Sequence, residues 1–206
     1  MSRDSAGSQK RIALFGGSFC PVHNGHLMLG SWLARFSGIA DEVWFVLSAH
    51  NPLKADVTYL LSDSERLELL KIATEGDTLL KVCDIELKMP RPSYTINTLD
   101  YLSEAYPQYQ FKWVVGADNW LEFEKWKDYH RIINDYGVIV YPRPGYEVNT
   151  AELPAGVEWA DAPQVDLSST FIRRGLAEGK NMKAFLPAGV WTRLKDFSSR
   201  RDEIKR

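Results

Sequence analysis

Two histidines three residues apart follow a pair of glycines near the start of the chain, in the segment GGSFCPVHNGH at residues 16–26. The apolar run at residues 11–15 predicts a strand, so the glycines predict a tight turn where that strand ends. Adjacent glycines allow a phosphate to approach backbone amides closely. One helical turn would present His23 and His26 toward the same point, where imidazoles can donate hydrogen bonds to phosphoryl oxygens. The segment therefore predicts a phosphate site.

Other interpretations of this segment are weaker. Gly16 and Gly17 are adjacent, which departs from the GxGxxG spacing of a dinucleotide-binding dehydrogenase, and the GxxxxGK[ST] pattern of a P-loop is missing. HxxH could be half of a metal site, but it lacks the glutamate of HExxH. An isolated HxxH would be read as two helix-capping histidines. The glycines, Ser18, Phe19 and a proline in front of the pair favour the phosphate interpretation.

A second candidate anion site lies far along the chain. Ser168, Ser169 and Thr170 precede an expected helix over residues 168–176 and would place hydroxyls and free amides at its start. Arg173 lies one turn further on and can reach the same oxygens with a planar fork. Alone, this would be an ordinary N-cap with a surface arginine. Two phosphate-binding helix starts in one chain are less easily explained as ordinary caps.

Apolar runs that predict strands alternate with helical patterns along most of the chain. The expected strands are 11–15, 41–47, 79–85, 111–115, 137–141 and 156–160. The expected helices are the apolar face 29–36, 62–72 behind a Ser62–Glu65 capping box, 95–106, one or two helices over 120–133, 168–176 and 187–197. This order predicts an α/β fold, a doubly wound parallel sheet with helices on both faces and a small C-terminal helical part. Such sheets bind ligands at the carboxyl ends of their strands.

The length of 206 residues is consistent with one domain. We expect a disordered tail over 1–10, a single domain over 11–197 and a charged, solvated end over 198–206.

Composition excludes several classes of protein. The formal charge is 25 − 27 = −2, which argues against a nucleic-acid-coating protein. Cys20 and Cys83 make neither a disulfide framework nor a zinc motif. No run of residues resembles a signal peptide or a membrane span. We therefore expect a cytoplasmic protein with neither a nucleic-acid nor a membrane partner; the sequence leaves the oligomeric state open, a homo-oligomer included.

The segment GGSFCPVHNGHL resembles the GxFxPxHxGH signature of the nicotinate- or nicotinamide-nucleotide adenylyltransferases and their relatives. The resemblance implies a Rossmann-like sheet and transfer of an adenylyl group from ATP to a mononucleotide 5′-phosphate, with release of pyrophosphate, in NAD biosynthesis. It also implies that His23 and His26 contact ATP phosphates. Cys20 stands where bacterial members commonly carry aspartate, so we interpret it as a small wall residue.

Two further segments extend the resemblance. Residues 165–173, VDLSSTFIR, are similar to the family's ISSTxIR element, which implies that this helix start holds ATP phosphates. Residues 91–99, RPSYTINTL, and the GAD at 116–118 followed by Trp126 look like the bacterial nicotinate-mononucleotide enzymes. They imply that Trp126 stacks on the pyridine ring, that Thr95 helps hold its carboxylate end and that Asp118 lies near the riboses.

The resemblance also gives Lys54 a role, because it matches a basic position after the second strand and could neutralise the acceptor phosphate. The expected site residues fall into three groups. The catalytic group is His23, His26 and Arg173. The ATP-binding group is Gly16, Gly17, Ser18, Phe19, His23, His26, Gly116, Asp118, Ser168, Ser169, Thr170 and Arg173. The mononucleotide-binding group is Lys54, Thr95 and Trp126.

We expect Mg²⁺ to enter with ATP, held by phosphate and water rather than by a protein metal site. The expected acceptor is nicotinate mononucleotide, with nicotinamide mononucleotide as the alternative, because the residues do not separate acid from amide. Other open alternatives are a phosphopantetheine adenylyltransferase, a cytidylyltransferase and a non-catalytic nucleotide sensor.

Overall fold

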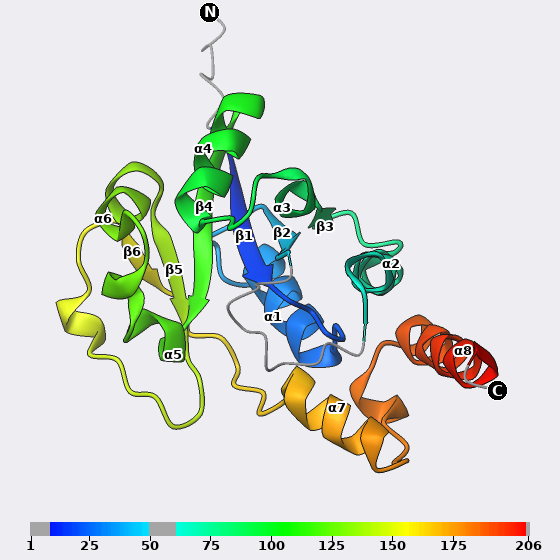
Figure 1. Cartoon of the computed structure of the whole chain (residues 1–206). Coiled ribbons are helices and arrows are strands. Elements are labelled where there is room, and N and C mark those ends of the chain that lie inside the picture. The colour runs from blue at the N-terminus through cyan, green and yellow to red at the C-terminus, as the bar shows by residue number, and fades with distance from the viewer. Residues whose placement is uncertain (1–8, 50–60, 205–206) are drawn as a thin grey trace, which may run out of the picture.

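The computed structural model describes residues 9–49 and 61–204, and the side chains of that part up to Phe197. A parallel six-stranded sheet in the order β3-β2-β1-β4-β5-β6 forms its centre (Figure 1). The strands are β1 Lys10–Gly17, β2 Glu42–Leu47, β3 Leu80–Cys83, β4 Tyr109–Gly116, β5 Val138–Tyr141 and β6 Val157–Trp159. The order reverses direction between β1 and β4, which is where such sheets bind ligands. The Rossmann-like α/β fold is confirmed.

Helices pack on both faces because the central strands bury side chains on both sides. In β1, Ala13 and Phe15 belong to one apolar cluster, while Ile12 and Leu14 belong to the other. The first cluster includes side chains of α1 Asn24–Arg35, α2 Asp63–Thr74, α7 Ser169–Ala177 and α8 Ala188–Ile204. The second includes side chains of α4 Thr95–Ala105. Figure 1 shows α1 and α4 on opposite faces of the sheet.

Local sequence signals explain where the longer helices begin. Ser62 caps α2 by accepting a hydrogen bond from the backbone N of Glu65, and the Glu65 carboxylate accepts one in return from the backbone N of Ser62, so the expected capping box is confirmed. Ser168 caps α7 by accepting from the backbone N of Phe171. Each cap satisfies amides that the helix leaves unpaired.

The segment between β4 and β5 differs from the expectation of one or two helices over 120–133. It consists of α5 Ala117–Trp120, the 3₁₀ turn η2 Phe123–Lys125, α6 Tyr129–Arg131 and the π-helix η3 Ile132–Tyr136. Asp128 has a left-handed backbone, with φ of 53°, which interrupts any longer helix. The aromatic side chains Phe123 and Trp126 pack toward the sheet and hold these short turns in place.

Other expected boundaries also shift. The third strand ends at Cys83, and Ile85 begins the short helix α3 Ile85–Lys88. The first strand already includes Lys10, one residue inside the expected tail. Helix α8 continues past Phe197 to Ile204, because the charged residues of this end are good helix formers. Two further 3₁₀ helices in the described part of the chain are η4 Thr150–Glu152 and η5 Lys183–Phe185. Among the described helices, none is long and apolar enough to cross a bilayer.

Candidate functional site

The carboxyl ends of β1, β4 and β5 form the floor of two adjoining cavities. The register of the sheet brings these ends to one edge, since Phe15 of β1 pairs with Val114 of β4, and Gly116 of β4 pairs with Tyr141 of β5. The first cavity has a volume of about 260 Å³ and the second about 450 Å³. Both are lined by Phe15, Gly16, Gly17, Ser18, Asn119 and Tyr141. The end of β1 is therefore a wall that the two cavities share.

Two glycines keep this edge open. A Cβ at Gly16 would overlap the indole of Trp113, and one at Gly116 would overlap the Asp118 carboxylate and approach Arg143 Cγ to 2.8 Å. Only glycine permits the backbone to approach these neighbours so closely. The glycines at the strand ends are thus required by packing around the cavities.

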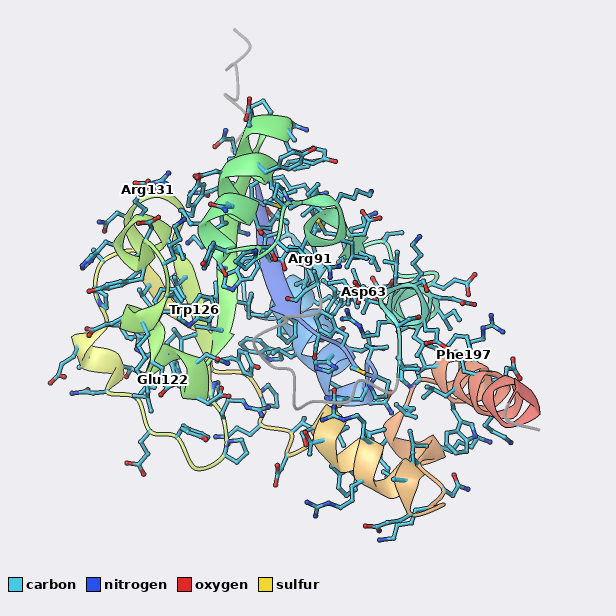
Figure 2. The ribbon with its side chains drawn as sticks, in the orientation of Figure 1. Asp63, Arg91, Glu122, Trp126, Arg131 and Phe197 are labelled. Atoms are coloured by element: carbon cyan, nitrogen blue, oxygen red, sulfur yellow. The ribbon has the colours of Figure 1, made fainter. Side chains whose placement is uncertain are left out.

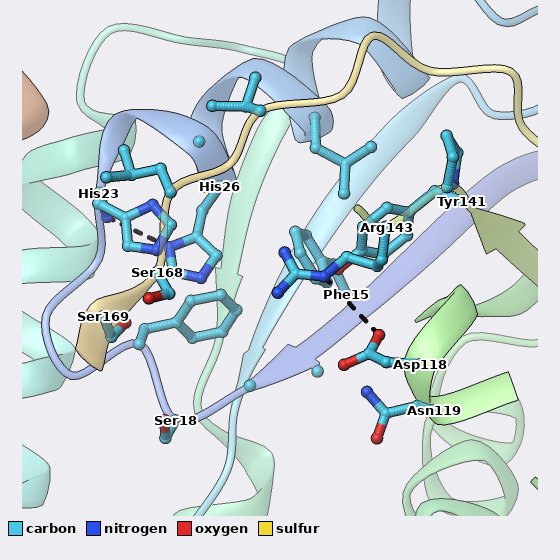
Figure 3. A pocket seen from close by; sticks show the side chains of 18 of the residues that line it. Phe15, Ser18, His23, His26, Asp118, Asn119, Tyr141, Arg143, Ser168 and Ser169 are labelled. Carbon is cyan, nitrogen blue, oxygen red and sulfur yellow. Dashed lines mark hydrogen bonds and ion pairs between the residues drawn. The ribbon is translucent and has the colours of Figure 1, made fainter. Parts of the chain in front are cut away.

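The histidine pair lies against the first cavity, at the start of α1 (Figure 3). The two imidazoles are stacked, with centroids 3.6 Å apart and planes inclined by 21°. His26 Nδ1 accepts a hydrogen bond from the backbone N of His23 at 3.2 Å. In neutral His26 this acceptor places the proton on Nε2, which is then a free donor.

Burial and charge keep both histidines neutral. Burial, and then the positive charge of Arg143, lower the pKa of His23 to about 4. Burial lowers the pKa of His26 well below its ordinary value, and His23 and Arg143 add to this effect. His23 is 3% exposed, and its buried Nδ1 has no hydrogen-bond partner within the described part of the chain. A buried polar atom without a partner is costly unless a ligand supplies one.

Arg143 lines the candidate site but was not predicted from the sequence. It follows β5, lines the first cavity and lies 3.8 Å from Asp118, measured between Nε and Oδ1. Figure 3 shows its guanidinium directed across the cavity toward the histidines. Tyr141 and Asn119 were missed as well, and burial raises the pKa of Tyr141 to about 12. The available signal was position alone, since Arg143 stands two residues after a predicted strand end.

The start of helix α7 forms a further wall of the first cavity. Ser168 and Ser169 line it, and Ser169 Oγ donates a hydrogen bond to the carbonyl of Pro21. Arg173 Nη1 donates to the carbonyl of Cys20 and Nη2 donates to Thr170 Oγ1, both at 3.0 Å. Arg173 thus fastens α7 to the loop before the histidines, Thr170 holds its guanidinium from within the helix, and neither residue lines the cavity. Their expected phosphate contacts remain predictions.

The structure brings most of the remaining expected residues to the two cavities at the carboxyl ends of the strands. Gly16, Gly17, Ser18, Phe19 and Asp118 line the first cavity, and Gly116, Thr95 and Trp126 line the second. Phe19 is buried, has a φ of 42° and packs edge-on against His26. Cys20 is fully buried. Lys54 lies outside the described residues.

The second cavity has a different character. It is bounded by the aromatic ring of Trp126, by Thr95 at the start of α4 and by the segment that precedes α4. Trp126 packs against Phe123, with ring centroids 4.9 Å apart. The buried carboxyl of Glu86 also lines this cavity and accepts hydrogen bonds from Ser93 and Thr98. Burial raises the pKa of Glu86, against the opposing effect of these hydrogen bonds.

Comparison with known proteins agrees with this geometry. Residues 14–175 match the model of the cytidylyltransferase-like family. A Bacteroides fragilis protein named "Probable nicotinate-nucleotide adenylyltransferase" is 43% identical over 91% of this chain and 92% of the relative. A Porphyromonas gingivalis protein of the same name is 46% identical over 84% of this chain and 88% of the relative.

A solved structure shares the fold. The nicotinic acid mononucleotide adenylyltransferase of Plasmodium falciparum, complexed with NaAD, superposes with a TM-score of 0.72 at 16% identity. The match covers 91% of this chain and 96% of the Plasmodium chain. From the family model and the close bacterial relatives together, the chain is a member of the cytidylyltransferase-like family and, within it, of the nicotinate-nucleotide adenylyltransferases.

Proposed function

We propose that this chain transfers the adenylyl group of ATP to nicotinate mononucleotide, giving the dinucleotide and pyrophosphate in NAD biosynthesis. The observation that carries the proposal is the pair of cavities that share the end of β1. ATP in the first cavity and the mononucleotide in the second would bring their phosphates together at Gly16–Gly17–Ser18. The names of the bacterial relatives support the same reaction.

The reaction requires alignment of the acceptor phosphate with the α-phosphorus of ATP more than it requires proton transfer. An oxygen of the acceptor 5′-phosphate attacks the α-phosphorus of ATP, the bond from that phosphorus to the bridging oxygen breaks, and pyrophosphate leaves with the electron pair. The nucleophile is already an anion, so no general base is needed. Catalysis then rests on positioning and on stabilising charge on the leaving group.

The first cavity offers donors for that charge. His26, neutral and with Nδ1 occupied, would donate from Nε2 to a phosphate oxygen, and His23 would donate beside it. Arg143 adds a positive charge, and α7 adds the positive end of a helix at Ser168–Ser169. We assign the binding of the leaving phosphates to these groups, with Arg173 holding α7 in place.

Mg²⁺ would arrive as part of the ATP complex and neutralise charge on the phosphates. The described residues contain no cluster of three or more His, Cys, Asp or Glu side chains that could hold a metal ion. Asp118 is the carboxylate that lines the first cavity, and its buried Oδ1 accepts no hydrogen bond from the described residues. This donor set fits an ion held mainly by phosphate and water.

The test is a pyrophosphate assay with purified protein, Mg²⁺ and ATP, supplying nicotinate mononucleotide, nicotinamide mononucleotide or phosphopantetheine separately. We expect pyrophosphate with nicotinate mononucleotide, and less with CTP in place of ATP. Release only with phosphopantetheine, or ATP binding without any release, would replace the proposal with another transferase or with a sensor.

A variant tests the role of the histidines directly. We expect His26→Ala to lower kcat by about 10²-fold or more, as for loss of one donor to a developing oxyanion. His130→Ala is the control, because His130 packs against Tyr129 and lines neither cavity. Unchanged turnover in His26→Ala would refute the role.

A further inference from the structure

A buried arginine outside the assigned site connects the walls of both cavities. Arg66 of α2 is 1% exposed. Its Nη1 donates to the carbonyl of Ser18 at 2.6 Å and to the carbonyl of Ser48 at 3.0 Å. Ser18 belongs to the wall that the cavities share, and Ser48 lines the second cavity only. One guanidinium thus ties the end of β1 to the end of β2.

The same side chain reaches a third segment through Asp63. Arg66 Nη2 donates to Asp63 Oδ1 at 2.7 Å, and Arg91 Nη2 donates to the other oxygen of that carboxylate at 3.0 Å. Figure 2 shows Asp63 and Arg91 close together near α2. Arg91 begins the segment before α4 that lines the second cavity. Although burial opposes it, the two arginines hold the pKa of Asp63 below its ordinary value.

We propose that Arg66 is a positioning residue that sets the shared wall for both substrates, and that Asp63 extends this support to Arg91 on the mononucleotide side alone. This inference rests on the proposed function for the identity of the substrates. A guanidinium that is only 1% exposed requires several fixed partners, and those of Arg66 include the Asp63 carboxylate and two backbone carbonyls of cavity-lining segments. A displacement of about 1 Å in such segments is enough to cost turnover.

The proposal predicts a different pattern for each of three variants. Arg66→Lys keeps the charge but loses the planar fork, so the KM values of both ATP and the mononucleotide should rise by about tenfold or more. Asp63→Asn should raise the KM of the mononucleotide about three- to tenfold and leave that of ATP within twofold. Arg193→Met is the control, since Arg193 makes a similar ion pair with Glu68 of α2, away from the cavities. It should change neither KM.

Asp63→Asn also separates positioning from simple electrostatics. Removing a carboxylate beside two arginines makes the second cavity more positive, so a purely electrostatic role would strengthen binding of the anionic mononucleotide. A positioning role predicts weaker binding. The two explanations therefore predict opposite changes in the affinity of Asp63→Asn for the mononucleotide.

Binding measurements keep the test independent of turnover. Calorimetric titration with a non-hydrolysable ATP analogue, and separately with nicotinate mononucleotide, should reproduce the pattern, with thermal unfolding confirming that each variant is folded. Should Arg66→Lys leave both dissociation constants within twofold of the parent chain, or Asp63→Asn bind the mononucleotide more tightly, the proposal is wrong. A parent chain that binds both ligands but releases no pyrophosphate would overturn the proposed function. The dissociation constants of the variants could still be compared, so the positioning role of Arg66 would still be tested.

Discussion

At the scale of single residues, the two stacked imidazoles couple stability to pH. Both histidines have lowered pKa values in the folded chain, His23 about 4, whereas imidazoles of an unfolded chain titrate near 6.5. The unfolded state therefore binds more protons as pH falls. The stabilisation is present above about pH 6.5 and is lost as pH falls toward 4, with a slope of at most about 1.4 kcal/mol per pH unit for each proton.

The measurement is urea unfolding of the parent chain and of His23→Gln at pH 4.5, 5.5 and 6.5. Other carboxylates titrate in this range in both proteins, so the difference between the two slopes isolates the histidine. We expect a smaller loss of stability on acidification in the variant. Identical slopes would mean that His23 takes up a proton in the folded state as easily as in the unfolded one.

Trp126 gives the second residue-scale prediction. Its ring lines the second cavity, where it could stack on a pyridine ring. Loss of one stacking aromatic costs about 1–3 kcal/mol in base-binding proteins, so Trp126→Ala should raise the KM of the mononucleotide about 5- to 150-fold. The KM of ATP should stay within twofold. Trp191→Ala on α8 is the control, because Trp191 lines neither cavity.

Among the residues that line the cavities, those in a contiguous motif could be predicted from the sequence, and isolated ones could not. His23, His26 and the glycines stand in a contiguous motif whose chemistry can be argued from residue type. The fold alone brings three other residues to the cavities or their walls, namely Arg143, Arg66 and Glu86. A lone arginine in a helical pattern looks like a solvated charge until the sheet brings two carbonyls to it.

At the scale of elements, the start of α7 combines a structural cap with a ligand wall. Ser168 caps the helix and also lines the first cavity. Ser168→Ala should lower the free energy of unfolding by about 0.5–2 kcal/mol, as for other N-caps. It should also raise the KM of ATP several-fold, since the exposed amides would lose their alignment.

Ser62→Ala provides the matched control. Ser62 caps α2 in the same way but lines neither cavity. We expect a similar loss of stability on urea unfolding with a smaller rise in the KM of ATP, because Ser62 acts on the cavities only through the first turn of α2 and Arg66. Equal effects of the two variants on that KM would show that capping alone, and not the position of α7, explains the result.

Element order was easier to predict than element boundaries. Apolar runs such as 111–115 identify strands because both faces of the sheet are covered. The region after β4 was harder, since its turns are held by tertiary packing of Phe123 and Trp126 rather than by local periodicity.

At the scale of the whole molecule, the two cavities predict one continuous site for a dinucleotide. Nicotinate adenine dinucleotide would fill both cavities. It loses translational entropy once, whereas two separate ligands each lose it, so the dinucleotide should bind more tightly than AMP or nicotinate mononucleotide. Ligand at about a hundredfold its Kd stabilises by about 2.7 kcal/mol, which is a rise in Tm of roughly 5–10 °C for a chain of this size.

Thermal unfolding with the three ligands at one concentration measures this effect. The dinucleotide should give the largest rise in Tm, and Trp126→Ala should reduce that rise while leaving the smaller AMP shift unchanged, because Trp126 lines the second cavity alone. Because the cavities share the wall at Gly16–Gly17–Ser18, both halves of the dinucleotide can bind at once and both contribute to its binding free energy. A dinucleotide shift no larger than that of the better half would mean that the wall separates the cavities instead of joining them.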